Sequence, residues 1–258
     1  MKAMIFAAGL GTRLKPITDT LPKALVPIAG KTLLEHVVIK LANAGFDELI
    51  INVHHHAEMI CSFLEEKKNF GLRIEVSDER DMLLDTGGGI RKAAHFFDDG
   101  RPFLVHNVDI ISDVDLNELY QKHCESDNLA TLLVKHRDTA RYLLFDQQMK
   151  MKGWTNIKTG EVKSPIENLQ VEDYDKLAFS GIHILSPKIF AYMADYPTIF
   201  PIMDFYIGSC GKINIGGVEN DAQKLIDVGK IESLAEAEGL VKSLIHCKAK
   251  RNTTVSSK

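Results

Sequence analysis

The feature that most constrains this chain is a short apolar run, residues 4–8, which stops abruptly at residues 9–13 (Gly-Leu-Gly-Thr-Arg). A run of this length fits a buried strand, and the glycines allow the next turn to expose its N–H groups. Such N–H groups form a concave anion site, and the Arg13 guanidinium adds a forked cation beside it. Further on, Lys23 follows the rigid Pro22. The stretch therefore predicts a phosphate-binding loop with two cations.

Three better-known phosphate loops do not fit these residues. The dinucleotide fingerprint and the kinase glycine loop both need a glycine at position 14, where this chain has Leu14. Residues 30–32 (Gly-Lys-Thr) resemble the end of a P-loop, but the first glycine of that motif would fall on Leu25. A glycine-rich turn with surface cations is the plain alternative to an anion site.

Apolar periodicity alternates between strand and helix through the first half of the chain. Helices are expected over residues 32–44, 57–68 and 87–97, and strands over residues 48–53, 72–77 and 103–105. This alternation indicates βαβ units and a doubly wound, mainly parallel α/β sheet with helices on both faces. Such sheets bind ligands outside the carboxyl ends of their strands. The loop after Ala8 and the carboxylate of Asp109 both lie at such ends.

The second half is less regular. Strands are expected over residues 129–135, 142–145, 177–185 and 223–228, and helices from Ser186-Pro187 and over residues 231–244. Residues 147–165 are expected to form polar turns, and residues 248–258 a frayed tail. No repeat or linker divides the chain. We therefore expect one domain over residues 1–246, followed by a polar tail over residues 247–258.

Composition limits the partners and the compartment. The 258 residues carry a formal net charge of −4 at pH 7 and have a pI of about 6.2, so no basic field attracts nucleic acid or an acidic membrane. Phosphate binding must come from local groups. Cys61, Cys124, Cys210 and Cys247 are scattered, which disfavours structural zinc and a disulfide framework. With neither a membrane span nor a signal peptide in evidence, a reducing cytoplasm and small-molecule substrates fit best.

Two aspartates are the natural ligands for a metal. Nucleotidyl transfer needs N–H groups and cations around a triphosphate, a divalent metal and a pocket for the attacking phosphate. Mg²⁺ is held by one or two carboxylates together with substrate phosphates. Asp109 and Asp227 each end an expected strand, which makes them a candidate Mg²⁺ pair; the alternative for either alone is a turn or a helix cap.

The N-terminal stretch resembles the motif of the sugar-1-phosphate nucleotidylyltransferases. The matching positions are Ala7, Ala8, Gly9, Leu10, Gly11, Thr12, Arg13, Leu14, Pro16, Thr18, Pro22, Lys23, Leu25, Pro27, Gly30 and Lys31. The resemblance implies a Rossmann-like nucleotidyltransferase fold of the glycosyltransferase-A-like kind. Its halves would be a nucleotide-binding part, about residues 1–110, and a sugar-binding part, about residues 111–246. It also implies that Asp109 and Asp227 hold Mg²⁺, although Val108 replaces the usual glycine.

We assign Arg13 to the leaving pyrophosphate and Lys23 to the α-phosphate and the attacking sugar phosphate. With Asp109 these are the expected catalytic residues; an oxygen of the sugar 1-phosphate is the nucleophile, so no protein nucleophile is needed. The expected nucleotide contacts are Ala8, Gly9, Leu10, Gly11, Thr12, Arg13, Lys23, Thr86, Gly87 and Asn107.

The base and the sugar are less determined. Residues 86–89 resemble the family's second nucleotide loop, which borders the base, but residues 78–80 offer no base-reading glutamine. For the sugar, the expected contacts are Glu167, which lacks the lysine that commonly follows it in the family, and Gly181. Trp154 either lines the sugar pocket or covers the core.

Within the family the chain is most similar to the bacterial N-acetylmuramate 1-phosphate uridylyltransferases. The resemblance lies in residues 86–90, 179–182, 227–229 and 234–238. It implies transfer from UTP to a sugar 1-phosphate with Mg²⁺. The alternatives are a mannose- or heptose-1-phosphate guanylyltransferase, a non-catalytic nucleotide-sugar-binding module and a dinucleotide-dependent oxidoreductase. The non-catalytic module would be expected to lack one of the charged site residues, and none is missing here.

Overall fold

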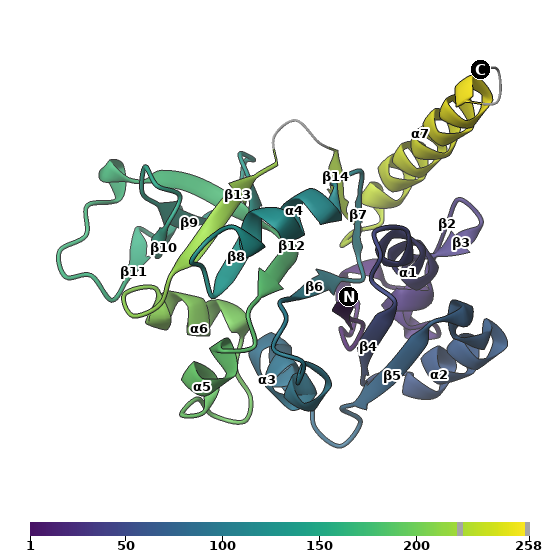
Figure 1. Cartoon of the computed structure of the whole chain (residues 1–258), viewed down its shortest axis with the longest axis horizontal. Coiled ribbons are helices and arrows are strands. Elements are labelled where there is room, and N and C mark those ends of the chain that lie inside the picture. Colours follow the sequence, from purple (N-terminus) through teal and green to yellow (C-terminus); the bar gives the residue numbers. More distant parts are fainter. Residues whose placement is uncertain (221–223, 256–258) are drawn as a thin grey trace.

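The computed structural model describes the backbone of residues 1–220 and 224–255, and the side chains of residues 1–220 and 224–245. A large mixed sheet runs through the molecule in the order β11-β10-β9-β12-β6-β1-β4-β5, and β8 joins β12 to β13 (Figure 1). Its strands are β1 (Lys2–Phe6), β4 (Glu48–Val53), β5 (Arg73–Asp78), β6 (Phe103–Asn107), β8 (Ala130–Lys135), β9 (Arg141–Phe145), β10 (Met151–Asn156), β11 (Glu161–Lys163), β12 (Asp175–Leu185) and β13 (Ile215–Glu219).

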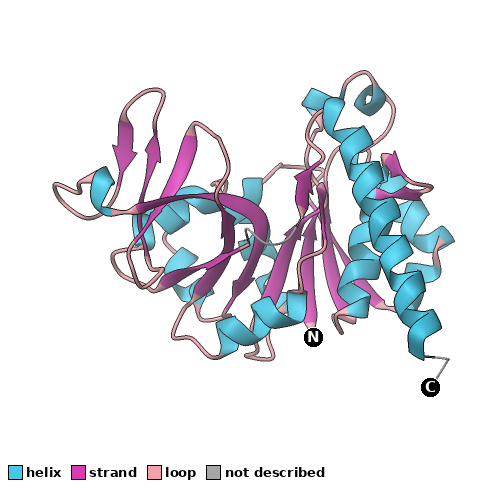
Figure 2. Cartoon of the chain, turned by 90° about the horizontal axis from the view of Figure 1, so that it is seen from above, coloured by secondary structure: helices cyan, strands magenta, loops and turns pink. Residues whose placement is uncertain are grey.

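Helices flank these strands on both sides (Figure 2). The α-helices of the described residues are α1 (Leu33–Asn43), α2 (Ala57–Glu66), α3 (Asp85–Lys92), α4 (Leu116–Cys124), α5 (Ile189–Met193), α6 (Ile202–Ser209) and α7 (Glu232–Val255). Short 3₁₀ turns and the small β2 (Pro27–Ile28) and β3 (Lys31–Thr32) ribbon complete the first half. No helix in the described residues is long and apolar enough to cross a membrane.

One half of the sheet is parallel. β1 lies between β4 and β6 and runs parallel to both, so that Met4 is aligned with Ile50 and Val105. These side chains are fully buried, as expected for strands covered on both faces. Helix α1 is capped at its N-terminus by Thr32, whose side chain accepts a hydrogen bond from the Glu35 N–H at 3.0 Å. The predicted doubly wound, mainly parallel α/β sheet is confirmed.

The other half is mainly antiparallel, with β13 parallel to β8, and is organised by the long strand β12. One end of β12 pairs with β9 and the other with β6, and its opposite edge pairs with β8. The register shifts between Phe179 and His183, and Gly181 inside the shift has φ 76°. A Cβ at Gly181 would lie 2.9 Å from Nδ2 of Asn107. Glycine therefore lets β12 pass close to the carboxyl end of β6.

Each face of the sheet has its own hydrophobic core. One core packs α1, α2, α4 and α7 against the strands. The other packs α3, α5 and α6, and contains a stack in which the Phe97 and Phe103 rings are 3.7 Å apart. Burying an aliphatic or aromatic side chain of this kind contributes roughly 1.5–3 kcal/mol. The two cores hold the strand ends, and hence the site, in place.

A small ribbon brings the end of the chain back to the middle. β7 (Ile110–Ser112) continues from β6 and pairs antiparallel with β14 (Leu225–Asp227), which aligns Asp227 with Ile110. Helix α7 follows and packs beside β7 and β2 before it extends away from the body (Figure 1). This ribbon joins the two halves at the carboxyl end of β6.

Several local predictions were wrong. Residues 147–165 hold β10 and β11 as well as turns, because the β9–β10 and β10–β11 pairings supply contacts that periodicity does not reveal. The backbone of α7 continues to Val255, so most of the segment expected to fray is helical, and residues 256–258 lie outside the described residues. Helix α3 starts two residues before the expected Gly87 and ends at Lys92, where a 3₁₀ turn follows. The strand expected over residues 223–228 begins at Leu225, and Gln223 lies outside the described residues.

Candidate active site

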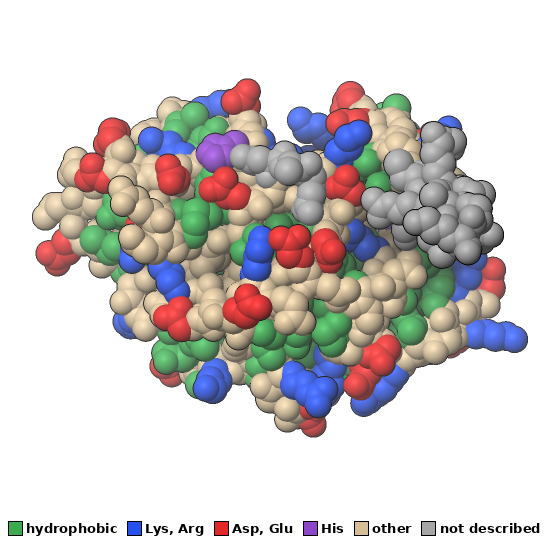
Figure 3. Space-filling view, turned by 45° about the horizontal axis from the view of Figure 1, so that its top comes forward, with side chains coloured by type: hydrophobic (Ala, Val, Ile, Leu, Met, Phe, Trp, Pro, Cys, Tyr) green, Lys and Arg blue, Asp and Glu red, His purple; other side chains and the backbone are tan. Residues whose placement is uncertain are grey.

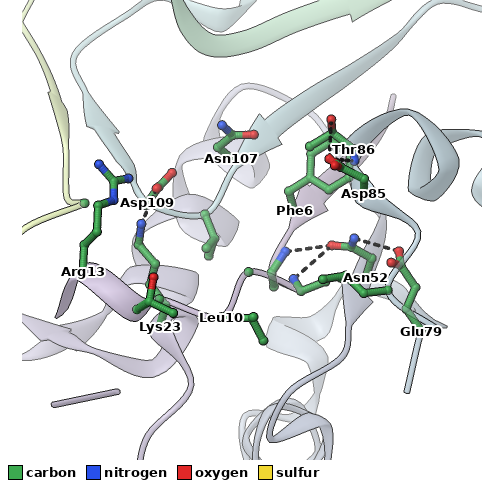
Figure 4. A pocket seen from close by; sticks show the side chains of 18 residues that line it. Phe6, Leu10, Arg13, Lys23, Asn52, Glu79, Asp85, Thr86, Asn107 and Asp109 are labelled. Carbon is green, nitrogen blue, oxygen red and sulfur yellow. Dashed lines mark hydrogen bonds and ion pairs between the residues drawn. The ribbon is translucent and has the colours of Figure 1, made fainter. Parts of the chain in front are cut away.

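A cavity of about 450 Å³ opens at the carboxyl ends of β1 and β6 (Figure 4). It is lined by Phe6, Ala7, Ala8, Gly9, Leu10, Gly11, Thr12, Arg13, Lys23, Asn52, Glu79, Leu83, Asp85, Thr86, Asn107, Val108, Asp109 and Gly229. Most of the residues predicted to contact the nucleotide are in this set. On the face drawn in Figure 3, acidic and basic side chains are interspersed.

The loop after β1 is shaped by Gly11. This residue has φ 63° and ψ 23°, in the left-handed region, and its carbonyl accepts hydrogen bonds from the Thr18 hydroxyl at 2.8 Å and the Leu14 N–H at 2.9 Å. A Cβ on Gly11 would lie 2.9 Å from Thr18 Cγ2 and 3.1 Å from Lys23 Cβ. Both the backbone conformation and the close approach of Lys23 therefore require glycine here.

Sequence reasoning missed Asn52, which holds the start of this loop. Its Oδ1 accepts hydrogen bonds from the N–H groups of Ala7 at 2.8 Å and Ala8 at 3.3 Å (Figure 4). These two N–H groups are thereby satisfied by the protein, so the N–H groups open to an anion begin at Gly9. The signal for Asn52 was visible: it is a buried amide inside the otherwise apolar strand β4.

Glu79 extends this network to the far side of the cavity. Its Oε1 accepts from Asn52 Nδ2 at 2.8 Å, and its Oε2 accepts from the Leu84 N–H at 3.0 Å. The side chain is 1% exposed, and a Cβ on Gly89 would lie 2.9 Å from Oε1. The Asn52–Glu79 pair thus ties the loop after β1 to the segment that leads into α3.

The predicted catalytic residues Lys23 and Asp109 meet in an ion pair. Lys23 Nζ donates to Asp109 Oδ2 on the cavity wall (Figure 4), and both side chains are less than one fifth exposed. In Figure 4 the Arg13 side chain lies on the same side of the cavity. The loop after β1 and the end of β6 therefore bring all three predicted catalytic residues together.

The second predicted metal ligand, Asp227, lies beside the first. Because β14 pairs with β7, the Val228 N–H donates to the Asp109 carbonyl at 2.8 Å. A Cβ on Gly229 would lie 2.8 Å from both Asp227 Oδ1 and Arg13 Nη2, so glycine there leaves space between the two side chains. Residues far apart in the sequence thus converge at the mouth of the first loop.

The Asp227 carboxylate is compatible with the metal-binding role that the sequence predicts for it. Its Oδ1 is buried and has no hydrogen-bond partner among the described residues. Burial raises the pKa of this carboxyl and the charge of Asp109 raises it further, while Lys23 and Arg13 lower it. A cation held between the two aspartates would relieve both effects. Two carboxylates and open space for phosphate oxygens match the donor set of Mg²⁺.

Of the two residues predicted near the base, Thr86 and Gly87, only one lines the cavity. Thr86 lines the cavity, and its hydroxyl accepts a hydrogen bond from the Ile202 N–H at 2.8 Å. Gly87 is not in the cavity wall: its N–H donates to the Phe200 carbonyl at 2.9 Å, and a Cβ would lie 2.2 Å from the Phe200 ring. Gly87 is therefore needed for packing α3 against the segment before α6.

The residues predicted for the sugar are not in the cavity wall. Glu167 is exposed in the loop after β11. Gly181 is required by the close approach of β12 to Asn107. Trp154, in β10, packs against the core, and the Lys163 ammonium lies 5.3 Å from its ring centroid. Of its two predicted roles, covering the core is the one that these contacts support.

The family model and the relatives that match this chain all point to nucleotidyl transferases. Residues 2–243 match the profile of the family described as Nucleotidyl transferase. An N-acetylmuramate alpha-1-phosphate uridylyltransferase of Neisseria meningitidis serogroup B is 31% identical over 240 residues, which cover 93% of this chain and 98% of that protein. A protein of the same name from Caulobacter vibrioides is 44% identical over 111 residues, which cover 42% of this chain and 46% of that protein.

Solved structures share the fold. A chain described as a glucose-1-phosphate thymidylyltransferase from Bacillus anthracis, in complex with a sucrose, superposes with a TM-score of 0.77 at 22% identity over 93% of this chain and 94% of that one. HddC from Yersinia pseudotuberculosis, complexed with GMP-PN, gives 0.72 at 24% identity over 93% and 99%. Matched over nearly its whole length, the chain belongs to the nucleotidyl transferase family, as a sugar-1-phosphate nucleotidylyltransferase.

Proposed function

We propose that the chain transfers the uridylyl group of UTP to N-acetylmuramate 1-phosphate or a closely related sugar 1-phosphate, in the cytoplasm. The observation that carries the proposal is the convergence of Asp109 and Asp227 beside the loop after β1, with Lys23 and Arg13 at the same point. The choice of uridine and of this sugar is supported by the relative that aligns over almost its entire length.

In this reaction an oxygen of the sugar 1-phosphate attacks the α-phosphorus of UTP. A new P–O bond forms while the bond from the α-phosphorus to the oxygen that bridges to the β-phosphorus breaks, and that electron pair leaves with pyrophosphate. The attacking oxygen is already ionised at neutral pH, so no general base is required. The protein must position the two phosphates and stabilise the charge that develops.

Each site residue has a part in that task. The free N–H groups from Gly9 onward, with Arg13, bind the β- and γ-phosphates and stabilise the leaving pyrophosphate. Lys23, fixed by its ion pair with Asp109, donates to the α-phosphate. Thr86 and Asn107 border the base and the ribose. The first half, residues 1–110, thus holds the nucleotide, and residues 111–246 hold the sugar.

Asp109 and Asp227 would hold Mg²⁺, which, when bound, neutralises charge on the triphosphate. The buried Oδ1 of Asp227, which no described residue satisfies, fits this assignment. In the described residues, no group of three or more His, Cys, Asp or Glu side chains could form a cage that excludes substrate from the metal. A site with two carboxylates leaves coordination positions for phosphate oxygens.

Guanylyl transfer to mannose 1-phosphate is the second candidate. A mannose-1-phosphate guanylyltransferase catalytic subunit beta of Dictyostelium discoideum is 30% identical over 79% of this chain and 56% of that protein. Uracil and guanine both present a ring N–H to the protein, so the common features of the site accept either base.

The test is pyrophosphate release by the purified chain with Mg²⁺, measured for the four NTPs against a panel of sugar 1-phosphates. We expect the highest kcat/KM for UTP with N-acetylmuramate 1-phosphate. A preference for GTP with mannose 1-phosphate would replace the first candidate by the second. Release with no pair would contradict the proposed function.

A further inference from the structure

The side of the cavity opposite Lys23 and Asp109 carries a carboxylate that was not predicted from the sequence. Asp85, the first residue of α3, lies in the cavity wall with an exposed side chain. In Figure 4, Asp85 and Thr86 lie across the cavity from Lys23 and Asp109. A carboxylate at this point repels phosphates, so the triphosphate is held on the Lys23 side and the nucleoside faces Asp85.

The orientation of this carboxylate is fixed by Thr86. Asp85 Oδ1 accepts hydrogen bonds from the Thr86 N–H at 2.6 Å and from the Thr86 hydroxyl at 3.2 Å. That hydroxyl accepts in turn from the Ile202 N–H, which leaves its own hydrogen for Asp85. The backbone of Asp85 has φ 60°, a left-handed conformation that aspartate tolerates better than most residues with a Cβ. The Asp85 side chain is therefore held in one arrangement.

The second oxygen of Asp85 is an acceptor without a donor. Across residues 1–220 and 224–245, Oδ2 accepts no hydrogen bond and forms no ion pair. The neighbouring polar side chains are occupied, because Asn52 Oδ1 and both carboxylate oxygens of Glu79 accept hydrogen bonds from the protein. An ionised carboxylate can only accept hydrogen bonds. Oδ2 of Asp85 therefore suits a ligand that donates one.

The four bases differ in whether they supply this donor. Uracil carries a ring N–H at N3 and guanine carries one at N1, whereas N3 of cytosine and N1 of adenine are unprotonated acceptors. A carboxylate oxygen that faces this edge binds uracil or guanine and repels the lone pair of cytosine or adenine. Phe6 and Leu83 add apolar surface to the cavity wall, against which a planar ring can pack.

We propose that Asp85 determines base specificity: its Oδ2 accepts a hydrogen bond from the ring N–H of uracil, and Thr86 positions the carboxylate for this contact. The assignment rests on the proposed function and deepens it. It names the group that separates UTP from CTP, whose base is a pyrimidine of the same size. Guanine N1–H makes the same contact, so the assignment also applies to the second candidate reaction.

The decisive variant is Asp85→Asn. Because the Thr86 N–H holds Oδ1, the amide Nδ2 takes the place of Oδ2 and presents a donor to the base. We expect the Kd of UTP to rise by about 10- to 100-fold, since one charge-assisted hydrogen bond is lost, and the Kd of CTP to fall. If Asp85 served only to anchor Thr86, the asparagine Oδ1 would keep that bond and neither Kd would change.

A second variant, Asp85→Gly, removes the carboxylate at a backbone conformation that glycine adopts freely. We expect this variant to bind UTP and CTP about equally. The nucleotide 3-methyl-UTP lacks the ring N–H and should bind the wild type at least about 10-fold more weakly than UTP. The matched control is Asp81→Asn, because Asp81 is an exposed aspartate of the same segment outside the cavity wall. It should leave every Kd unchanged.

The measurement is calorimetric titration of each nucleotide with Mg²⁺, in the absence of a sugar 1-phosphate. If no sugar 1-phosphate is turned over, the proposed function fails while the Kd values still decide the role of Asp85. Tighter binding of CTP by Asp85→Asn supports the assignment and shows that the variant is folded. The same ratio of CTP to UTP Kd values in Asp85→Asn as in the wild type, or no binding of UTP by the wild type, overturns the assignment.

Discussion

The parallel and antiparallel halves of this sheet do different work. In the parallel half, β1 and β6 end at adjacent points, and the short loops that follow them carry the phosphate-binding N–H groups, Lys23 and Asp109. In the antiparallel half, β12 ties β6, β8 and β9 together, and the shift in its register lets Gly181 lie against the Asn107 side chain. The first half concentrates its charged groups in two adjacent loops, whereas the second is built from pairings between separate strands.

The comparison predicts two kinds of kinetic effect. Changes near the reacting phosphate in the parallel half should lower kcat, because they affect groups aimed at it. Changes in the antiparallel half should affect binding of the sugar 1-phosphate more than kcat.

The largest effect is expected in the parallel half at Lys23. Lys23→Ala removes a fixed donor from the α-phosphate and should lower kcat by about 10²- to 10³-fold. The fold should be retained, since the side chain lies at the cavity wall and not in a core. Pyrophosphate release measures the effect and urea unfolding checks stability. A near-wild-type kcat in this variant would contradict a role for Lys23 in the mechanism and the expectation that changes in the parallel half lower kcat.

The next effect is on stability, at Asn52. Asn52→Ala leaves the buried Ala7 N–H and the Glu79 carboxylate without their partner. Each unsatisfied buried group costs about 1–3 kcal/mol, so we expect the free energy of unfolding to fall by about 3 kcal/mol. The matched change in the antiparallel half is Asn156→Ala; among the described residues, the Asn156 side chain accepts a hydrogen bond only from the Lys158 N–H, in a hairpin turn. Equal losses of unfolding free energy in Asn52→Ala and Asn156→Ala, measured by urea unfolding, would contradict a special role of the Asn52–Glu79 network in supporting the loop.

Acid should weaken the antiparallel half through its buried histidines. Burial lowers the pKa of His183 to about 3 and that of His123 to about 4, and the charge of His106 adds to the effect on His183. Both groups bind protons more readily in the unfolded chain, at an ordinary pKa near 6.5. Their neutral forms therefore contribute stability above about pH 6.5 that is lost as the pH falls towards 4.

The expected size of this loss is up to about 1.4 kcal/mol per pH unit for each histidine. The Tyr206 hydroxyl and His183 Nδ1 form a hydrogen bond of 2.8 Å, and protonation leaves the ring with no acceptor nitrogen. His183→Gln keeps an acceptor without a titrating ring, so the slope of unfolding free energy against pH should decrease. An unchanged slope between pH 6.5 and 4 would show that His183 titrates alike in the folded and unfolded chain.

The smallest effect is expected at Glu167. Its side chain is exposed and outside the cavity wall, so Glu167→Gln should change KM for the sugar 1-phosphate by less than about 2-fold. The measurement is steady-state pyrophosphate release at varied concentrations of the sugar 1-phosphate. A large rise in KM would restore Glu167 as a sugar contact and place a second binding element in the antiparallel half.

The fold and the site residues of the parallel half were more predictable from the sequence than those of the antiparallel half. The parallel half was visible in the sequence because buried strands, helix periodicity and the glycine loop are local signals, and Arg13, Lys23 and Asp109 follow from them. Asn52 also gave a local signal, as an amide in an apolar strand, which the sequence reasoning did not use. Gly87 was expected at the nucleotide but is explained by packing on Phe200.

The antiparallel half depended on pairings that no local pattern encodes. The β14–β7 ribbon aligns Asp227 with Ile110 across the chain, whereas the sequence placed Asp227 only at the end of an expected strand and the family resemblance supported its pairing with Asp109. Strands β10 and β11 arise from contacts between separate strands. In polar, turn-rich segments such as residues 147–165, the sequence pattern does not distinguish short strands from loops.

The metal site formed by Asp109 and Asp227 is tested most directly with Mn²⁺ in place of Mg²⁺. Mn²⁺ binding is followed by electron paramagnetic resonance in the presence of a non-hydrolysable UTP analogue. The wild type should bind Mn²⁺ tightly only when the nucleotide is present, and Asp109→Asn or Asp227→Asn should each weaken this binding by at least about 10-fold. Equal Mn²⁺ affinity in the wild type and both variants would contradict a metal site shared by the two halves.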